Sequence, residues 1–198
     1  ISNVLKELEI KVDQGFETKN YSENIDLFII GNVVSRGNPL MEKILNNKNE
    51  YLSGPEFLYR YILKDRHVIS VSGTHGKTTT SAMISKILMD AKVDTGYLIA
   101  GKVIGFDTSA KLGNNDFFVV ESDEYDTSFF DKRSKFVHYR PSTLLINNLE
   151  FDHADIFDNL DSIKKQFHHL IRSLPSSAKV IFPEDDENIE SLINQGLY

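Results

Sequence analysis

The sequence predicts an α/β fold in which a mostly parallel sheet carries helices on both faces. Short apolar runs alternate with longer amphipathic segments along most of the chain, which is the pattern of strands and helices in such folds. A glycine-containing loop joins one apolar run to an amphipathic segment, and polar side chains directly follow other apolar runs. The strands expected in the longer, second part of the chain cover residues 67–71, 96–100, 117–121, 143–147 and 179–182, and the helices cover 78–90 and 162–174.

The first part of the chain is a shorter block of the same kind. Residues 26–31 form an apolar run that is typical of a buried strand, and residues 5–14 carry a pattern that could begin another element. Helices are expected over 39–47, with a proline near the first turn, and over 55–63. Because the helical run ends just before the next strand, we expect a first domain over 1–64 and a second over 65–198.

The composition limits the class of protein. The chain has 198 residues, of which 40% are hydrophobic, and this is enough for a sizeable core. A net charge of -7 and a pI near 5.4 argue against general affinity for nucleic acid or for an anionic membrane. The chain has no cysteine, and its apolar runs are too short to cross a bilayer. We therefore expect a cytoplasmic protein with no nucleic-acid and no membrane partner.

The glycine loop over residues 73–80, with the sequence G-T-H-G-K-T-T-T, predicts a phosphate site. Backbone N–H groups of such a loop converge on phosphate oxygens, and the following helix points its positive dipole end at them. Lys77 supplies an ammonium, and the Thr78 hydroxyl is placed to join the coordination shell of Mg²⁺. The first glycine of the common P-loop pattern would fall at Val71, so the fit is imperfect. The candidate nucleotide-contacting residues are Gly73, Thr74, Gly76, Lys77, Thr78 and Thr79.

Four carboxylates follow the apolar run 117–120 within six positions. Carboxylates this close repel one another unless a cation or basic groups intervene. Since Mg²⁺ prefers oxygen ligands and keeps several waters, one carboxylate beside Thr78 would suffice, and Glu121 at the strand end is the candidate. For Asp123, Glu124 and Asp126 an ordinary acidic solvated loop is nearly as good an interpretation.

A third group of polar residues, 147–153 with the sequence N-N-L-E-F-D-H, again follows an apolar strand. A neutral imidazole beside carboxylates can ligate a metal or contact a phosphate, which makes His153 a candidate. Taken alone, His153 is more often a hydrogen-bonded turn residue. His168 and His169 share a helix with large apolar residues, so at least one of them is expected to pack or to be solvated.

Two further segments have competing interpretations. The cations at 132, 133, 135 and 140 lie among aromatic residues, as in a nucleic-acid patch, but the many acids nearby argue against nucleic-acid binding. The polar turn Ser35-Arg36-Gly37-Asn38 follows the first strand, and on local chemistry alone it is equally well an ordinary loop.

The three motifs G-T-H-G-K-T-T-T, E-S-D-E-Y-D and N-N-L-E-F-D-H, in this order and at strand ends, resemble those of the Mur ligases. These enzymes use ATP to join amino acids or peptides to UDP-muramoyl precursors of peptidoglycan. The stretch F-F-D-K-R-S-K-F-V-H-Y-R-P and the upstream I-G-N-V-V-S-R-G-N-P resemble the members that attach L-alanyl-γ-D-glutamyl-meso-diaminopimelate, a recycled tripeptide, to UDP-N-acetylmuramate. A member that instead takes free L-alanine is the alternative, and a nucleotide-binding switch without ligation is an alternative of another class.

The resemblance implies a role for each candidate residue. Lys77 would contact the ATP phosphates, Thr78 and Glu121 would hold a first Mg²⁺, and His153 would serve a second metal position. Asn148 would face the nucleotide. The residues that would lie toward the muramoyl substrate are Ser35, Arg36, Asn38 and His75. The implied reaction transfers a phosphoryl group from ATP to the substrate carboxylate, and the peptide amine then attacks the acyl phosphate.

The resemblance also implies that the chain contains parts of two of the family's three domains. The Rossmann-like first domain would lack its start, the ATP-binding central domain would follow it, and the C-terminal domain would be absent. We therefore expect this chain to be inactive alone. Some members carry a carbamylated lysine after the D-H motif, and neither Lys164 nor Lys165 is assigned that role. The oligomeric state is not predicted.

Overall fold

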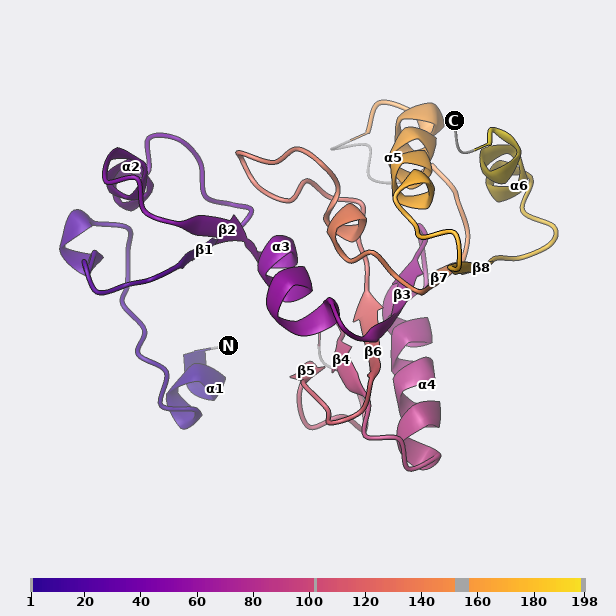
Figure 1. Ribbon diagram of the computed structural model, residues 1–198, viewed down its shortest axis with the longest axis horizontal. Coiled ribbons are helices and arrows are strands. Elements are labelled where there is room, and N and C mark those ends of the chain that lie inside the picture. The colour runs from indigo at the N-terminus through magenta and orange to yellow at the C-terminus, as the bar shows by residue number, and fades with distance from the viewer. Residues whose placement is uncertain (1, 102, 152–156, 197–198) are drawn as a thin grey trace.

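The computed structural model describes residues 2–101, 103–151 and 157–196. Within these residues, six strands form one sheet in the order β5-β4-β6-β3-β7-β8. All of its neighbouring pairs are parallel except β4 with β5, so the predicted α/β fold with a mostly parallel sheet is confirmed (Figure 1). The strands are β3 (His67–Ser72), β4 (Gly96–Leu98), β5 (Ala110–Lys111), β6 (Phe117–Glu121), β7 (Thr143–Ile146) and β8 (Lys179–Ile181).

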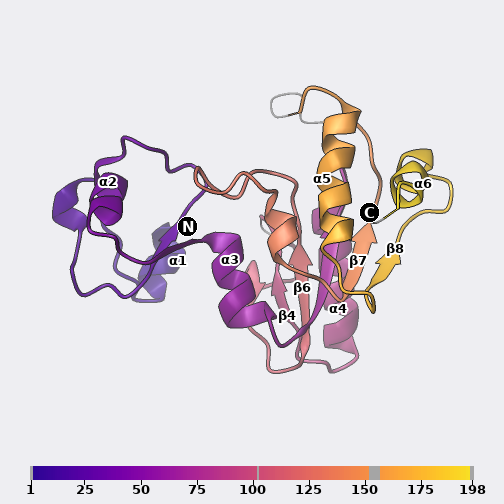
Figure 2. The same cartoon turned by 45° about the horizontal axis from the view of Figure 1, so that its top comes forward.

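Helices cover both faces of this sheet, as predicted. On one face, α4 (Lys77–Asp90) packs against a cluster around Tyr97, Ile99 and Val119. On the other face, α5 (Leu160–Arg172) and α6 (Glu187–Asn194) lie side by side (Figure 2). They cover the larger core, in which the rings of Phe136 and Phe167 meet edge to face. Val68, Phe118 and Val120 belong to the larger core, whereas Ile69 and Val119 belong to the cluster under α4. Both central strands therefore carry apolar residues on both faces.

The register of the central strands brings three chain segments to one edge of the sheet. Val71 pairs with Glu121, and Ser72 pairs with Ile146. Since all three strands are parallel, the glycine loop, the acidic segment and Asn147 leave the sheet at the same edge. This is the edge at which open α/β sheets bind ligands.

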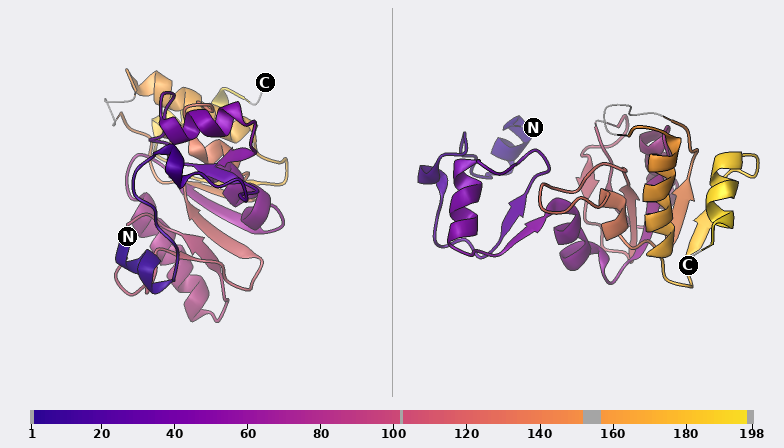
Figure 3. Two further views of the ribbon diagram at one scale, coloured as in Figure 1. Left: turned by 90° about the vertical axis from the view of Figure 1, so that its left-hand side faces the viewer. Right: turned by 90° about the horizontal axis from the view of Figure 1, so that it is seen from above.

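The first block lies to one side of the sheet (Figure 3). It contains α1 (Ser2–Glu7), β1 (Phe28–Ile30), α2 (Pro39–Asn46) and β2 (Tyr51–Ser53), and β1 and β2 pair in parallel. The chain then continues through α3 (Gly54–Leu58) and one stretch of π-helix, Tyr59–Leu63, into β3.

The core of the first block is completed by two aromatic residues from the second part of the chain. Ile30, Met41 and Ile44 form its buried centre, and Phe129 and Phe130 pack against it. The rings of Phe130 and Tyr51 meet edge to face with their centroids 4.9 Å apart. The expected division into 1–64 and 65–198 stays a proposal, and these contacts cross it.

Several elements differ from the expectation. The strands β2 and β5 are not among the predicted elements, because neither lies within a longer apolar run, unlike the equally short β1, β4 and β8. The helix expected over 55–63 becomes π-helical after Leu58. Helix α5 begins at Leu160 because Asn159 and Ser162 form a capping box. Residues 8–14 contain no helix or strand.

No helix within the described residues has the length and apolar character that a membrane span requires.

The aromatic contact across the two parts predicts a local loss of stability on substitution. Phe130→Ala removes half-buried ring contacts, so we expect a loss of about 1–2 kcal/mol, below the roughly 3–5 kcal/mol of a fully buried phenylalanine. Hydrogen exchange, read peptide by peptide, checks this: exchange should rise in residues 28–53 and stay unchanged in β3, β6 and β7. Phe182→Ala, at a residue 36% exposed, is the matched control. Unchanged exchange in residues 28–53 would contradict the proposed contact.

Candidate functional site

Both glycines of the loop are required by its geometry. Gly73 and Gly76 have φ of 125° and 78°, a region that L side chains rarely adopt. A Cβ at Gly73 would lie 2.9 Å from the carbonyl oxygen of Asn148, and one at Gly76 would lie 3.1 Å from Nδ2 of Asn147. The loop therefore takes this path only because it carries no side chain at these two positions.

The missing glycine of the common pattern has a structural reason. Val71 is still inside β3, is fully buried, and pairs with Glu121. The strand continues to Ser72, and α4 already begins at Lys77. The loop is thus confined to residues 73–76.

Two adjacent asparagines hold the loop from the neighbouring strand. The Asn147 amide nitrogen donates to the carbonyl oxygen of His75 (3.2 Å) and to Oγ1 of Thr80 (3.1 Å). The Asn148 amide accepts from the backbone N–H of His75 (2.8 Å) and donates to the carbonyl oxygen of the same residue (3.3 Å). Asn148 is a predicted nucleotide-contacting residue, and its amide fixes the loop backbone. Asn147 is not among the predicted site residues.

The turn after these asparagines is fixed in its own right. Oγ1 of the buried Thr74 donates to the carbonyl oxygen of Glu150 (3.0 Å) and accepts from its N–H (2.9 Å). Asp186, the N-cap of α6, accepts from the N–H of Leu149 (3.0 Å), and Asn188 donates to the Leu149 carbonyl (2.9 Å). The Thr74 hydroxyl is thus hydrogen-bonded within the protein. Asp186 also supports this turn, and no local sequence motif predicts that role.

Lys77 lies folded back over the loop. Its ammonium donates to the carbonyl oxygens of Gly73 (2.7 Å) and Thr74 (3.3 Å), and it lies 3.5 Å from Oε2 of Glu124. The Lys77 side chain is 13% exposed and that of Glu124 only 3%. Glu124 thus belongs to the loop environment rather than to a solvated acidic segment.

Thr78 and Glu121 meet, as their positions at the loop and the strand end predict. Oγ1 of Thr78 donates to Oε1 of Glu121 at 2.8 Å, and the other carboxylate oxygen accepts from the N–H of Ala100, also at 2.8 Å. A hydroxyl and one carboxylate beside a phosphate loop are a donor set that fits Mg²⁺, which keeps several waters and bridges phosphates. The described residues contain no cluster of three or more His, Asp or Glu side chains able to cage a metal. Thr79 is exposed on the first turn of α4.

Of the two predicted site histidines, the structure describes only His75. His153 lies outside the described residues. His75 is exposed at the tip of the loop, and its Nε2 lies 3.9 Å from Oε2 of Glu150. Its predicted role toward the substrate stays a prediction.

The polar turn of the first block has structural partners nearby. Arg36 binds Glu42 through two contacts of 2.8 and 3.0 Å, and the Gly37 N–H donates to the same carboxylate at 2.7 Å. These hydrogen bonds lower the pKa of Glu42 to about 2, the contact with Arg36 being the largest cause. Asn38 caps α2 by accepting from two N–H groups, and Ser35 accepts from the N–H of Asn38. Their roles toward a substrate stay predictions.

Three of the four cations at 132, 133, 135 and 140 pair with nearby acids, and Arg140 donates to the Tyr59 hydroxyl at 3.2 Å. Asp123 binds Lys135 at 3.0 Å, and Asp126 binds Lys132 at 2.9 Å. Arg133 pairs with Asp131, which lowers the pKa of that carboxyl.

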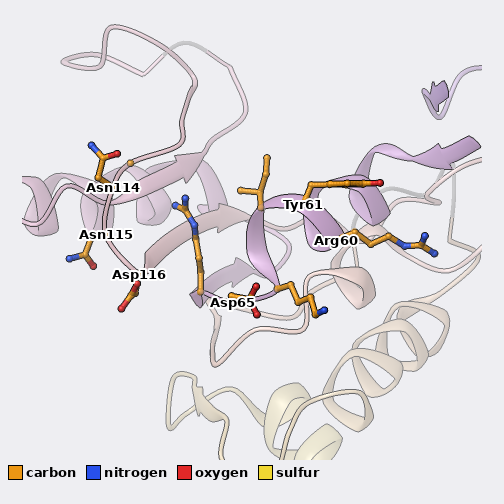
Figure 4. Close-up of a pocket in the computed structure, with 10 residues that line it drawn as sticks. Arg60, Tyr61, Asp65, Asn114, Asn115 and Asp116 are labelled. Atoms are coloured by element: carbon orange, nitrogen blue, oxygen red, sulfur yellow. The ribbon is translucent and has the colours of Figure 1, made fainter. Parts of the chain in front are cut away.

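Cavities occur at opposite edges of the sheet. One of about 420 Å³ lies at the carboxyl ends of β4 and β6, between α3 and the site, and Glu121, Asp123 and Lys135 line it. Another of about 460 Å³ lies at the opposite edge, where Arg60, Asp65 and Asp116 surround it (Figure 4). Because parallel sheets bind ligands beyond their carboxyl ends, we assign the site to the edge with Glu121.

The sequence is similar to those of known proteins. The chain is 49% identical over all of its 198 residues to the UDP-N-acetylmuramate–L-alanyl-γ-D-glutamyl-meso-2,6-diaminoheptandioate ligase of Escherichia coli, and it covers 43% of that protein. A UDP-N-acetylmuramate–L-alanine ligase of Syntrophomonas wolfei is 30% identical over 93% of the chain, which covers 38% of it. The chain thus spans less than half the length of these relatives.

A solved structure of a related protein is also similar to this chain. The crystal structure of UDP-N-acetylmuramate:L-alanyl-γ-D-glutamyl-meso-diaminopimelate ligase from Neisseria meningitides matches with a TM-score of 0.93 at 44% identity, over 98% of this chain and 63% of that one. A family model, the Mur ligase middle domain, matches residues 71–196. That match takes in the glycine loop from the end of β3 onward, together with Glu121 and the paired asparagines. The chain belongs to the Mur ligase family, through the family's middle domain.

Proposed function

We propose that the protein is an ATP-dependent ligase that attaches L-alanyl-γ-D-glutamyl-meso-diaminopimelate to UDP-N-acetylmuramate in peptidoglycan recycling. The observation that carries the proposal is the meeting of Thr78 and Glu121, 2.8 Å apart, at the start of α4 beside Lys77. The identity of 49% to the Escherichia coli ligase over the whole chain supports this choice of substrates.

The residues of the loop suit phosphoryl transfer. The N–H groups at the start of α4 and the ammonium of Lys77 would bind the ATP phosphates and offset the charge on the transferred group. Thr78 and Glu121 would hold Mg²⁺, which supplies charge neutralisation at the phosphate oxygens. The carboxylate of UDP-N-acetylmuramate would attack the γ-phosphorus of ATP in line and release ADP. The tripeptide amine would then attack the carbonyl carbon of the acyl phosphate, lose a proton and release inorganic phosphate as the amide bond forms. These steps need positioning and electrostatics rather than a protein nucleophile.

The other site residues keep the roles that the family resemblance implies. We propose His153 for a second metal position and Asn148 for the nucleotide side of the site. We propose that His75 and the turn with Ser35, Arg36 and Asn38 face the muramoyl substrate. A cytoplasmic location belongs to the same proposal, because the reaction consumes ATP.

The choice of acceptor is tested by phosphate release in a protein of the relatives' full length that contains this chain. With ATP, Mg²⁺ and UDP-N-acetylmuramate, we expect release to depend on the tripeptide and to stay at background with L-alanine. Release with L-alanine alone would favour the alanine-adding activity, and release without either acceptor would favour a nucleotide switch.

Removal of the Lys77 charge is expected to weaken nucleotide binding. Lys77→Met keeps much of the side-chain bulk but loses the ammonium, so the Kd for MgATP should rise about tenfold or more. Isothermal titration calorimetry measures this, and thermal unfolding shows whether the variant is folded. Lys86→Met, on an exposed lysine of the same helix, should bind as the parent does. Equal affinities of the two variants for MgATP would contradict the placement of Lys77 in the phosphate site.

Glu121→Gln is expected to change the metal dependence of nucleotide binding. The amide oxygen of glutamine can still accept from the N–H of Ala100, but the charge facing the metal is lost. The Mg²⁺ concentration for half-maximal ATP binding should therefore rise about tenfold. Glu190→Gln, at an exposed position of α6, is the control. An unchanged Mg²⁺ profile would argue that Glu121 is not a metal ligand.

A further inference from the structure

The contact between Lys77 and Glu124 has no place in the reaction described above. The two side chains are 13% and 3% exposed, and the ammonium nitrogen lies 3.5 Å from Oε2 of the carboxylate. A carboxylate this deeply buried is costly unless it is paired, and Lys77 is a cationic partner within ion-pair distance.

The ammonium of Lys77 is fully engaged in this arrangement. A lysine ammonium has three N–H donors, and here it contacts the carbonyl oxygens of Gly73 and Thr74 in addition to Glu124. A phosphate oxygen can therefore gain this ammonium only by displacing one of these partners. Glu124 is the one of the three that carries a charge, as a phosphate does.

The backbone at Glu124 and Tyr125 is held in place by two hydrogen bonds. The carbonyl oxygen of Glu124 accepts from Oγ of Ser134 at 2.6 Å, and that hydroxyl also lies 3.1 Å from Oε1 of Gln166 on α5. The next residue, Tyr125, accepts from the N–H of Lys135 through its carbonyl. These contacts tie the backbone that carries the carboxylate to α5 and to the following turn. The backbone is therefore held there when the lysine moves.

We propose that Glu124 competes with the nucleotide phosphates for Lys77 and thereby sets the affinity of the loop for anions. In the absence of nucleotide, the carboxylate takes the place that a phosphate oxygen takes later. When an anion binds, the ammonium turns away from Glu124, so the loss of the contact with Glu124 is subtracted from the gain of the contact with the anion. Glu124 is a positioning residue that acts through Lys77. The inference rests on the proposed ATP site.

A purely structural role of the ion pair makes the opposite prediction. If the pair only stabilises the loop, neutralising Glu124 loosens the loop and leaves anion binding equal or weaker. If the pair competes with phosphate, neutralising Glu124 frees the ammonium and strengthens binding. The sign of the change in affinity therefore separates the two roles.

The experiment is calorimetric titration of the 198-residue chain with ATP, ADP and inorganic pyrophosphate, without and with Mg²⁺. For Glu124→Gln we expect a Kd for ATP without Mg²⁺ that is about tenfold lower than in the parent, with a smaller gain when Mg²⁺ is present. Asp126→Asn removes an exposed carboxylate two residues away that pairs with Lys132, and it should leave the Kd unchanged.

The double variant Lys77→Met/Glu124→Gln tests whether the effect passes through the lysine. In the Lys77→Met background, Glu124→Gln should change the Kd less than twofold. A full gain in that background would overturn the competition, because the carboxylate would then act on the anion directly. An equal or weaker affinity of Glu124→Gln alone would also overturn it.

A second variant covers the case in which Glu124→Gln does not fold. Glu124→Asp keeps the charge but shortens the side chain by one methylene, so its affinity for ATP should lie between those of the parent and the neutral variant. An affinity below that of the parent in a folded Glu124→Asp chain would contradict the inference. Failure of the parent chain to bind any of the three anions would instead contradict the proposed ATP site.

Discussion

The whole site depends on the close approach of two backbones that leaves no room for a side chain. The loop passes the Asn147–Asn148 backbone so closely that a Cβ at Gly73 would lie 2.9 Å from a carbonyl oxygen. This approach lets Thr74 bind the Asn148 carbonyl with its N–H, and it lets the two asparagine amides reach His75. The parallel register of β3, β6 and β7 makes the approach possible, since the strands end at one edge.

Much of the fold and part of the site could be predicted from the sequence. Strong apolar runs gave the central strands, and the order of strand, glycine loop and helix gave α4 within one residue. Thr78 follows the glycine loop after one strand, and Glu121 ends a parallel neighbour of that strand. The two side chains were therefore predicted to lie together, and they form a hydrogen bond. The short strands β2 and β5 could not be predicted, because the residues around them do not form an apolar run as those around β1, β4 and β8 do.

What could not be predicted are the partners that distant segments supply. Asp186 supports the turn at Leu149 across 37 positions, and Glu124 reaches Lys77 across 47. Local sequence patterns do not indicate such pairings, since both residues belong to acidic stretches that could equally well be exposed to solvent. A buried, paired carboxylate and a solvated one look the same in a sequence. Tertiary packing alone separates Glu124 from Asp126.

The contact of Phe129 and Phe130 with the first block bears on how the chain is made. Tyr51 meets the ring of Phe130, so the first block cannot complete its core until about 80 further residues have been synthesised. At ribosomal rates of about 5–20 residues per second, the segment around β1 and β2 waits on the order of 4–16 s with apolar surface uncovered. During that interval Tyr51 and the apolar side chains near it lack the cover that Phe129 and Phe130 later provide.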